Sequence, residues 1–151
     1  CEYQNGFGCH SKHINDTIIH YSIPNYDTIN LVNATNFRDS YMKNLNIGMK
    51  YIKYYYRLSE FIKTKKLMNL SNIASSYSVA TGCVDIANTL VNGSGSSIVI
   101  TQSFKTNALN LINSYKNITT NEIIISILDD IEKDLDNYTG LTKVQLLSII
   151  N

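Results

Sequence analysis

The residue types best suited to chemistry lie within the first 20 positions of the chain. Cys9, His10, His13 and His20 supply a thiol and imidazoles, which are the ligands that zinc prefers. Structural zinc sites usually bring such ligands in closely spaced pairs, and this segment has no such pairing. A nucleophilic cysteine would also need a base held rigidly beside it. We therefore expect no metal centre, no cofactor and no enzymatic activity.

Three cysteines, Cys1, Cys9 and Cys83, form an odd set. In an oxidising compartment two of them would pair and one would stay free or pair with another chain. A bond between Cys1 and Cys9 would close a small loop, whereas a bond between Cys9 and Cys83 would attach that loop to a helix. The sequence leaves both pairings open. The first residue is Cys1 rather than Met, which is consistent with removal of a secretory peptide and with a lipid anchor on that cysteine.

Six segments fit the acceptor pattern for N-linked glycans, Asn-x-Ser/Thr. Several of them lie at expected helix ends or turns, where a glycan is tolerated. Together with the cysteines they predict an exported protein that is secreted or held at the cell surface. The acceptor residues are Asn15, Asn33, Asn69, Asn92, Asn117 and Asn137.

Basic residues recur on one side of the segment 43–57, with tyrosines between them. Such interleaving can hold phosphates and stack nucleobases. The whole chain, however, carries a formal net charge of only +1, whereas nucleic-acid-binding domains are usually strongly basic. A solvated helix face is the more ordinary interpretation, and nucleic acid is not an expected partner. The residues of this candidate anion-binding face are Lys43, Lys50, Lys53 and Arg57.

The longest helical repeat runs from residue 36 to residue 66. Its apolar residues are spaced by three or four, as one face of a helix requires. Gly48 lies on this face, so either another segment approaches closely there or the helix breaks into two. The apolar positions are Phe37, Tyr41, Leu45, Gly48, Ile52, Tyr55, Leu58 and Ile62.

A second helix is expected over residues 70–91, because apolar residues again recur at alternating steps of three and four. The sequence 92–97, rich in Gly and Ser, predicts a flexible connection to a third helix at 97–115. The expected inner seam of the second helix is Leu70, Ile73, Tyr77, Ala80, Val84, Ala87 and Val91.

Capping patterns predict the last two helices. Thr119 with Glu122 forms the pattern of a capping box, and Gly140 is expected to end the helix that follows. Thr142 with Gln145 predicts a short final helix. The fourth helix carries an acidic outer face, which we expect to be solvated or to pair with the basic residues above. Its acids are Asp129, Asp130, Glu132, Asp134 and Asp136.

The order Phe37-Arg38-Asp39, then Gly48, then Tyr55-Tyr56-Arg57-Leu58-Ser59 resembles the second half of the CFI-box domain. That short domain lies at the C-terminal ends of many bacterial secreted and surface proteins. The resemblance covers residues 37–62. The family's first motif, CFIATAAYG, has no counterpart in residues 9–36, and Glu60 stands where the family usually has proline. The resemblance implies an exported bacterial protein, and it assigns no functional residue.

The length of 151 residues and the hydrophobic fraction of 44% fit one folded domain. No apolar run is long enough to cross a membrane as a helix. We predict an all-α bundle of four main helices with a short C-terminal helix, over residues 36–151, and an irregular N-terminal arm over residues 1–35. The expected function is that of an exported structural or protein-interaction module, capable of self-association. The alternative is a carrier of a small apolar ligand in a cavity between the helices.

Overall fold

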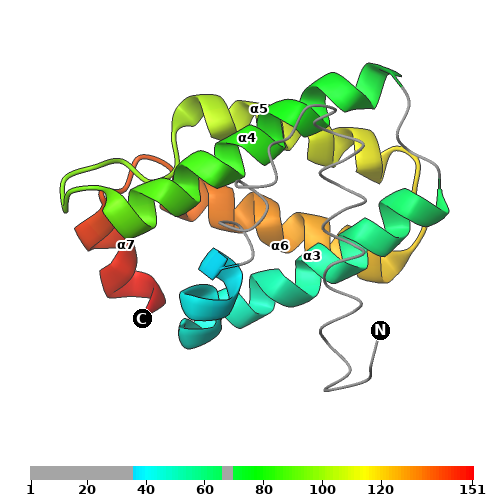
Figure 1. Cartoon of the computed structure of the whole chain (residues 1–151). Helices are drawn as coiled ribbons and strands as arrows, with labels where there is room; N and C mark the ends of the chain where they lie inside the picture. The colour runs from blue at the N-terminus through cyan, green and yellow to red at the C-terminus, as the bar shows by residue number, and fades with distance from the viewer. Residues whose placement is uncertain (1–35, 66–69) are drawn as a thin grey trace.

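The computed structural model describes residues 36–65 and 70–151, and their regular structure is entirely helical (Figure 1). The only pairing of β type among them is one isolated antiparallel bridge between Ile98 and Thr142. The prediction of an all-α bundle is therefore confirmed. The elements are a helical segment at 36–40, the 3-10 turn η1 (Met42–Asn44), and helices α3 (Asn46–Thr64), α4 (Leu70–Asn92), α5 (Gln102–Lys116), α6 (Glu122–Tyr138) and α7 (Lys143–Ile150).

The main helices pack in the spatial order α4, α5, α6, α3 (Figure 1). One apolar cluster lies where α3, α5 and α6 meet, and the most deeply buried of its side chains is Leu128. A second cluster lies at the other end of the bundle, where α7 packs against the last turn of α4. Its buried members are Leu90, Val99, Leu146 and Ile150.

The expected continuous helix over 36–66 is interrupted, and α3 begins only at Asn46. Leu45 adopts an extended conformation with φ −105° and ψ 136°, which ends the preceding turn. The break therefore precedes Gly48 by three residues. A Cβ atom at Gly48 would lie 1.9 Å from the carbonyl oxygen of Met42. Both interpretations of Gly48 thus have a basis: the helix does break, and the glycine lets the backbone of η1 lie directly on α3.

The bounds expected for the second helix agree with α4, but the predicted inner seam is wrong at two of its positions, and the side chains of Leu70 and Ile73 lie outside the described residues. Tyr77 and Val91 are exposed, whereas their preceding neighbours Ser76 and Leu90 are buried. One residue corresponds to a rotation of about 100° around a helix. Around Ser76 and Leu90, the buried side of α4 is therefore turned by about 100° from the predicted one.

Two predicted helix starts are also corrected. Residues 97–101 are not helical, because Ile98 pairs with Thr142, and α5 starts at Gln102. The N-cap of α6 is Asn121, whose side chain accepts hydrogen bonds from the N–H groups of Ile123 and Ile124. Thr119 is not the cap, since its hydroxyl accepts a hydrogen bond from the N–H of Asn121.

The signals around the final helix are confirmed. Gly140 follows α6 with a positive φ of 83°, a conformation that glycine adopts without strain. Thr142 and Gln145 form the predicted capping box at the start of α7. Leu146 and Ile150 pack into the second apolar cluster, whereas Val144 is exposed.

Candidate functional site

A charged network joins α3 to α6. The Lys50 ammonium lies 2.8 Å from Oδ2 of Asp130 and 2.6 Å from Oδ2 of Asp134. The hydroxyl groups of Tyr51 and Tyr54 donate hydrogen bonds of 2.9 Å to Asp134 and Asp130, respectively. The two carboxylates are one helical turn apart on α6, so the facing residues of α3 can reach both of them.

Asp134 is only 6% exposed, so its expected place on a solvated outer face is wrong. The alternative expectation is that acids of α6 pair with basic residues of α3. Asp130 and Asp134 do so, because both form ion pairs with Lys50. Burial of a charge is costly unless the charge is paired and hydrogen-bonded. Asp134 meets that condition, because it accepts hydrogen bonds from both the Lys50 ammonium and the Tyr51 hydroxyl.

The network shifts the pKa values of its members, so that each group keeps the protonation state that it has in these hydrogen bonds. Burial alone would lower the pKa of Lys50, but the hydrogen bonds to Asp130 and Asp134 outweigh it and raise that pKa to about 12. The same ammonium, with the Tyr54 hydroxyl, lowers the pKa of Asp130. Burial and the nearby Asp134 carboxylate raise the pKa of Tyr51. Lys50 therefore stays charged and Tyr51 stays a hydrogen-bond donor at neutral pH.

The residues predicted to form an anion-binding face are placed in different surroundings. Lys43 forms an ion pair of 3.0 Å with Asp39, and Lys50 belongs to the network with α6. Lys53 and Arg57 are exposed, and neither forms an ion pair with another residue in the described ranges. Half of the predicted face is thus already neutralised within the protein. Binding of an anion there stays a prediction.

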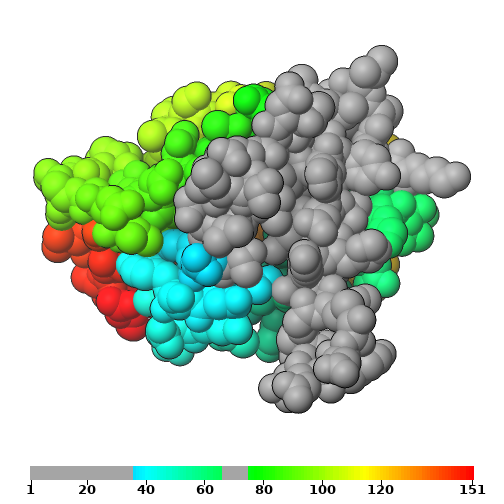
Figure 2. Space-filling model, in the orientation of Figure 1, coloured from blue at the N-terminus to red at the C-terminus, as the bar shows by residue number. Residues whose placement is uncertain are grey.

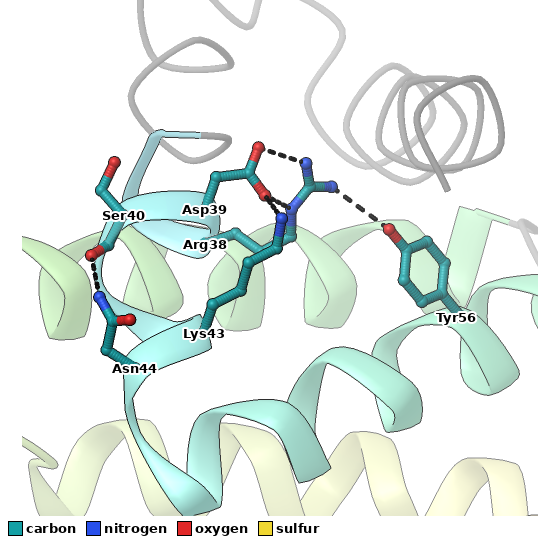
Figure 3. Close-up of polar contacts among 6 residues, drawn as sticks. All are labelled: Arg38, Asp39, Ser40, Lys43, Asn44 and Tyr56. Carbon is teal, nitrogen blue, oxygen red and sulfur yellow. Dashed lines mark hydrogen bonds and ion pairs between the residues drawn. The ribbon is translucent and has the colours of Figure 1, made fainter. Parts of the chain in front are cut away.

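A second polar cluster ties the segment 36–40 to α3 (Figure 3). The guanidinium of Arg38 donates hydrogen bonds of 2.8 and 2.9 Å to the two carboxylate oxygens of Asp39, and a longer one of 3.4 Å to the Tyr56 hydroxyl. The hydrogen bond from Arg38 lowers the pKa of Asp39 to about 2. Arg38, Asp39 and Tyr56 all belong to the pattern that resembles the CFI-box domain, and here they hold the segment preceding η1 against α3.

The end of the bundle at α7 carries exposed apolar side chains on a fixed backbone. The connection between α4 and α5 is hydrogen-bonded to the start of α7: the Lys143 N–H donates to Ser97 at 2.8 Å, and the Val144 N–H donates to Gly95 at 3.1 Å. The Lys143 ammonium also donates to the carbonyl of Gly93 at 2.9 Å. Both segments reach the surface at this end (Figure 2). We call the exposed side chains Val91, Ile98, Val144 and Ile149 the apolar end.

The expected glycan acceptors divide into two groups. Asn92 ends α4, Asn117 follows α5 and Asn137 lies in the last turn of α6, and all three are exposed. Asn15, Asn33 and Asn69 lie outside the described residues. Glycosylation stays a prediction at all six positions.

The predicted cysteine and histidine sites fall mainly outside the described residues. Cys83 is a free, exposed cysteine on α4, whereas Cys1, Cys9 and all three histidines precede residue 36. Within 36–65 and 70–151, no group of His, Cys, Asp and Glu could hold a metal ion. No helix in these ranges is long and apolar enough to span a membrane. Disulfide pairing and the lipid anchor on Cys1 stay predictions.

In comparisons with known proteins, no family model, no curated protein and no solved structure matches the chain.

Proposed function

We propose that this protein is an exported, non-catalytic protein-interaction module that self-associates through the apolar end. One observation carries this proposal: four exposed aliphatic side chains belong to the end of α4, its connection to α5, and α7, and hydrogen bonds join the backbone of that connection to α7. A preorganised surface loses little conformational entropy on binding. The formal net charge of +1 also means that two copies repel each other only weakly.

The expected association is weak. Full burial of a Val or Ile side chain contributes about 1.5–3 kcal/mol. These side chains are roughly half exposed, so a symmetric contact burying all four on both copies contributes on the order of 6–12 kcal/mol. Association costs about 4–15 kcal/mol in lost translational and rotational freedom. The balance runs from about 8 kcal/mol in favour of association to about 9 kcal/mol against it, so the dissociation constant of such a dimer is no tighter than about micromolar.

Analytical ultracentrifugation over a wide range of protein concentrations tests the proposal. The average mass of the unmodified chain should rise above 17.0 kDa as its concentration increases. Val144→Asp should abolish this rise, because it places a charge in the contact. A monomeric mass at every concentration would overturn the proposed self-association.

Ile123→Asp is the matched control for Val144→Asp. Val144 is 64% exposed and Ile123 is 60% exposed, and each is the second residue of its helix. A carboxylate near a helix N-terminus is favourable in both variants, so neither should unfold. Ile123→Asp should associate like the unmodified chain. Equal loss of association in both variants would show that added charge, and not the apolar end, controls it.

Export is supported by the sequons, the cysteines and the resemblance to the CFI-box domain. The intact mass of protein from its natural source, measured before and after reduction, tests it. Added hexose units would support a eukaryotic secretory route and contradict the bacterial resemblance. A lipid mass on Cys1 would support a bacterial surface protein. A mass equal to that of the bare chain, unchanged by reduction, would remove the support that glycans, lipid and disulfides give to export.

A further inference from the structure

An open groove of about 260 Å³ lies between α4 and the first half of α5. In this groove the ring of Phe104 lies against the backbone of α4: a Cβ atom at Gly82 would lie 2.3 Å from that ring. Because α5 runs back along α4 (Figure 1), Asn107 lies toward Tyr77 at one end of the groove, and Asp85 lies toward the start of α5 at the other. The groove is thus lined by residues of α4, the start of α5 and the residue that precedes it.

The groove contains polar groups that the protein leaves unused. Neither the Asp85 carboxylate nor the Asn107 amide forms an ion pair or side-chain hydrogen bond with another residue in the described part of the chain, and the Ser103 hydroxyl is likewise without such a partner. Tyr77 is 48% exposed, so part of its ring is open to solvent. A carboxylate, an amide, a hydroxyl and an open aromatic face therefore line one groove.

This combination fits a ligand that is rich in hydroxyl groups and has apolar ring faces. A carboxylate accepts hydrogen bonds from hydroxyl groups, and an amide both donates and accepts them. An aromatic ring can pack against the apolar face of a sugar ring while the polar edge of the aromatic ring remains in contact with water. We propose that the groove binds a neutral disaccharide, with one sugar ring against Tyr77 beside Asn107 and the second ring toward Asp85.

The length of the groove favours this ligand over an organic cation. Tyr77 and Asp85 are eight residues apart on α4, which corresponds to about 12 Å along the helix axis. A small cation held by an aromatic face and a carboxylate must contact both within a few ångströms. A chain of two sugar rings can instead reach both ends. An anionic ligand is disfavoured by the Asp85 carboxylate.

Chemical-shift titration of the ¹⁵N-labelled full chain tests the proposal. The probes are lactose, maltose, cellobiose and N,N′-diacetylchitobiose, with N-acetyl-lysine amide as the cationic comparison. At least one disaccharide should shift the amide signals of residues 77–85 and 101–107. The expected affinity is in the millimolar range, because an open groove covers only part of the ligand.

Substitutions then locate the site. Tyr77→Ala should weaken disaccharide binding at least tenfold, whereas Tyr77→Phe, which keeps the ring, should retain it. Alanine is a better helix former than tyrosine at an exposed position, so the fold should persist. Glu60→Gln, which removes an exposed carboxylate on α3 outside the groove, should leave binding unchanged. The proposal is overturned if no disaccharide binds, if Tyr77→Ala binds normally, or if only the lysine amide binds and Asp85→Asn abolishes that.

Discussion

Replacement of Asp134 by alanine probes the network between α3 and α6 most sharply. Asp134 accepts hydrogen bonds of 2.6 Å from the Lys50 ammonium and 2.9 Å from the Tyr51 hydroxyl. A hydrogen bond to a charged group contributes about 1.5–3 kcal/mol. The sum of two such values overstates the loss. Lys50 keeps its ion pair with Asp130, and the Lys50 side chain is 31% exposed to water.

The largest remaining loss is therefore at Tyr51, whose hydroxyl is left without Asp134. An unsatisfied buried donor costs about 1–3 kcal/mol, and alanine regains up to about 0.7 kcal/mol of helix propensity. We expect Asp134→Ala to lower the free energy of unfolding by about 2 kcal/mol. For a chain of 151 residues this corresponds to a fall in Tm of about 4–8 °C.

Urea denaturation followed by circular dichroism measures this loss, and Asp136→Ala is the matched control. Asp136 lies two residues further along α6 and pairs with Lys105 at 2.7 Å, but its side chain is 67% exposed. Exposed ion pairs contribute about 0–1 kcal/mol, so this variant should be close to neutral. If the two variants differ by less than about 0.5 kcal/mol, the partners of Asp134 do not stabilise the interface as the geometry implies.

Three further predictions concern acid stability and two local contacts. Because Lys50 lowers the pKa of Asp130 below its ordinary value of 3.8, this carboxylate stabilises the fold above about pH 4, and its contribution is lost as the pH falls through the lowered pKa. Asp130→Asn should therefore make the free energy of unfolding less dependent on pH between about 5 and 2, as followed by urea titrations, and an unchanged dependence would contradict the assignment. Gly82→Ala should cost about 1–3 kcal/mol, because its methyl group meets the Phe104 ring, and Phe104→Leu in the same chain should recover part of that loss in thermal denaturation. Asn121→Ala should cost about 1 kcal/mol through loss of the α6 cap, whereas alanine at the adjacent exposed Thr120 should cost little in the same assay.

The features that sequence predicted best depend on residues close together in the chain. The capping box of Thr142 and Gln145 and the glycine after α6 require only a few neighbouring residues. Three-four periodicity likewise placed α4 within one residue at its C-terminal end. Such signals are local, so no knowledge of the rest of the fold is needed to use them.

The features that sequence missed depend on contacts between distant segments. Burial of Asp134 requires Lys50 and Tyr51, which lie more than 80 residues earlier. The late start of α5 requires Thr142, which pairs with Ile98 from beyond α6. From sequence alone, a charged residue on a helix is predicted to face solvent, because the position of its partner is not known.

The sequence indicates Gly48 as the place where the helix could break, but the break before α3 occurs at Leu45. No proline or glycine marks Leu45, and the two asparagines beside it are only modestly poor helix formers. The packing of η1 against Gly48 selects the broken form over a continuous helix. Likewise, the apolar seam of α4 could not reveal which side α5 would cover.

The most direct test of the proposed self-association is a comparison of amide NMR spectra of the unmodified chain at high and low concentration. Dilution should shift the signals of Val91, Ile98, Val144, Ile149 and their neighbours, and should leave those around Ile123 in place. Spectra that do not change with concentration, or changes confined to the α5–α6 turn, would contradict it.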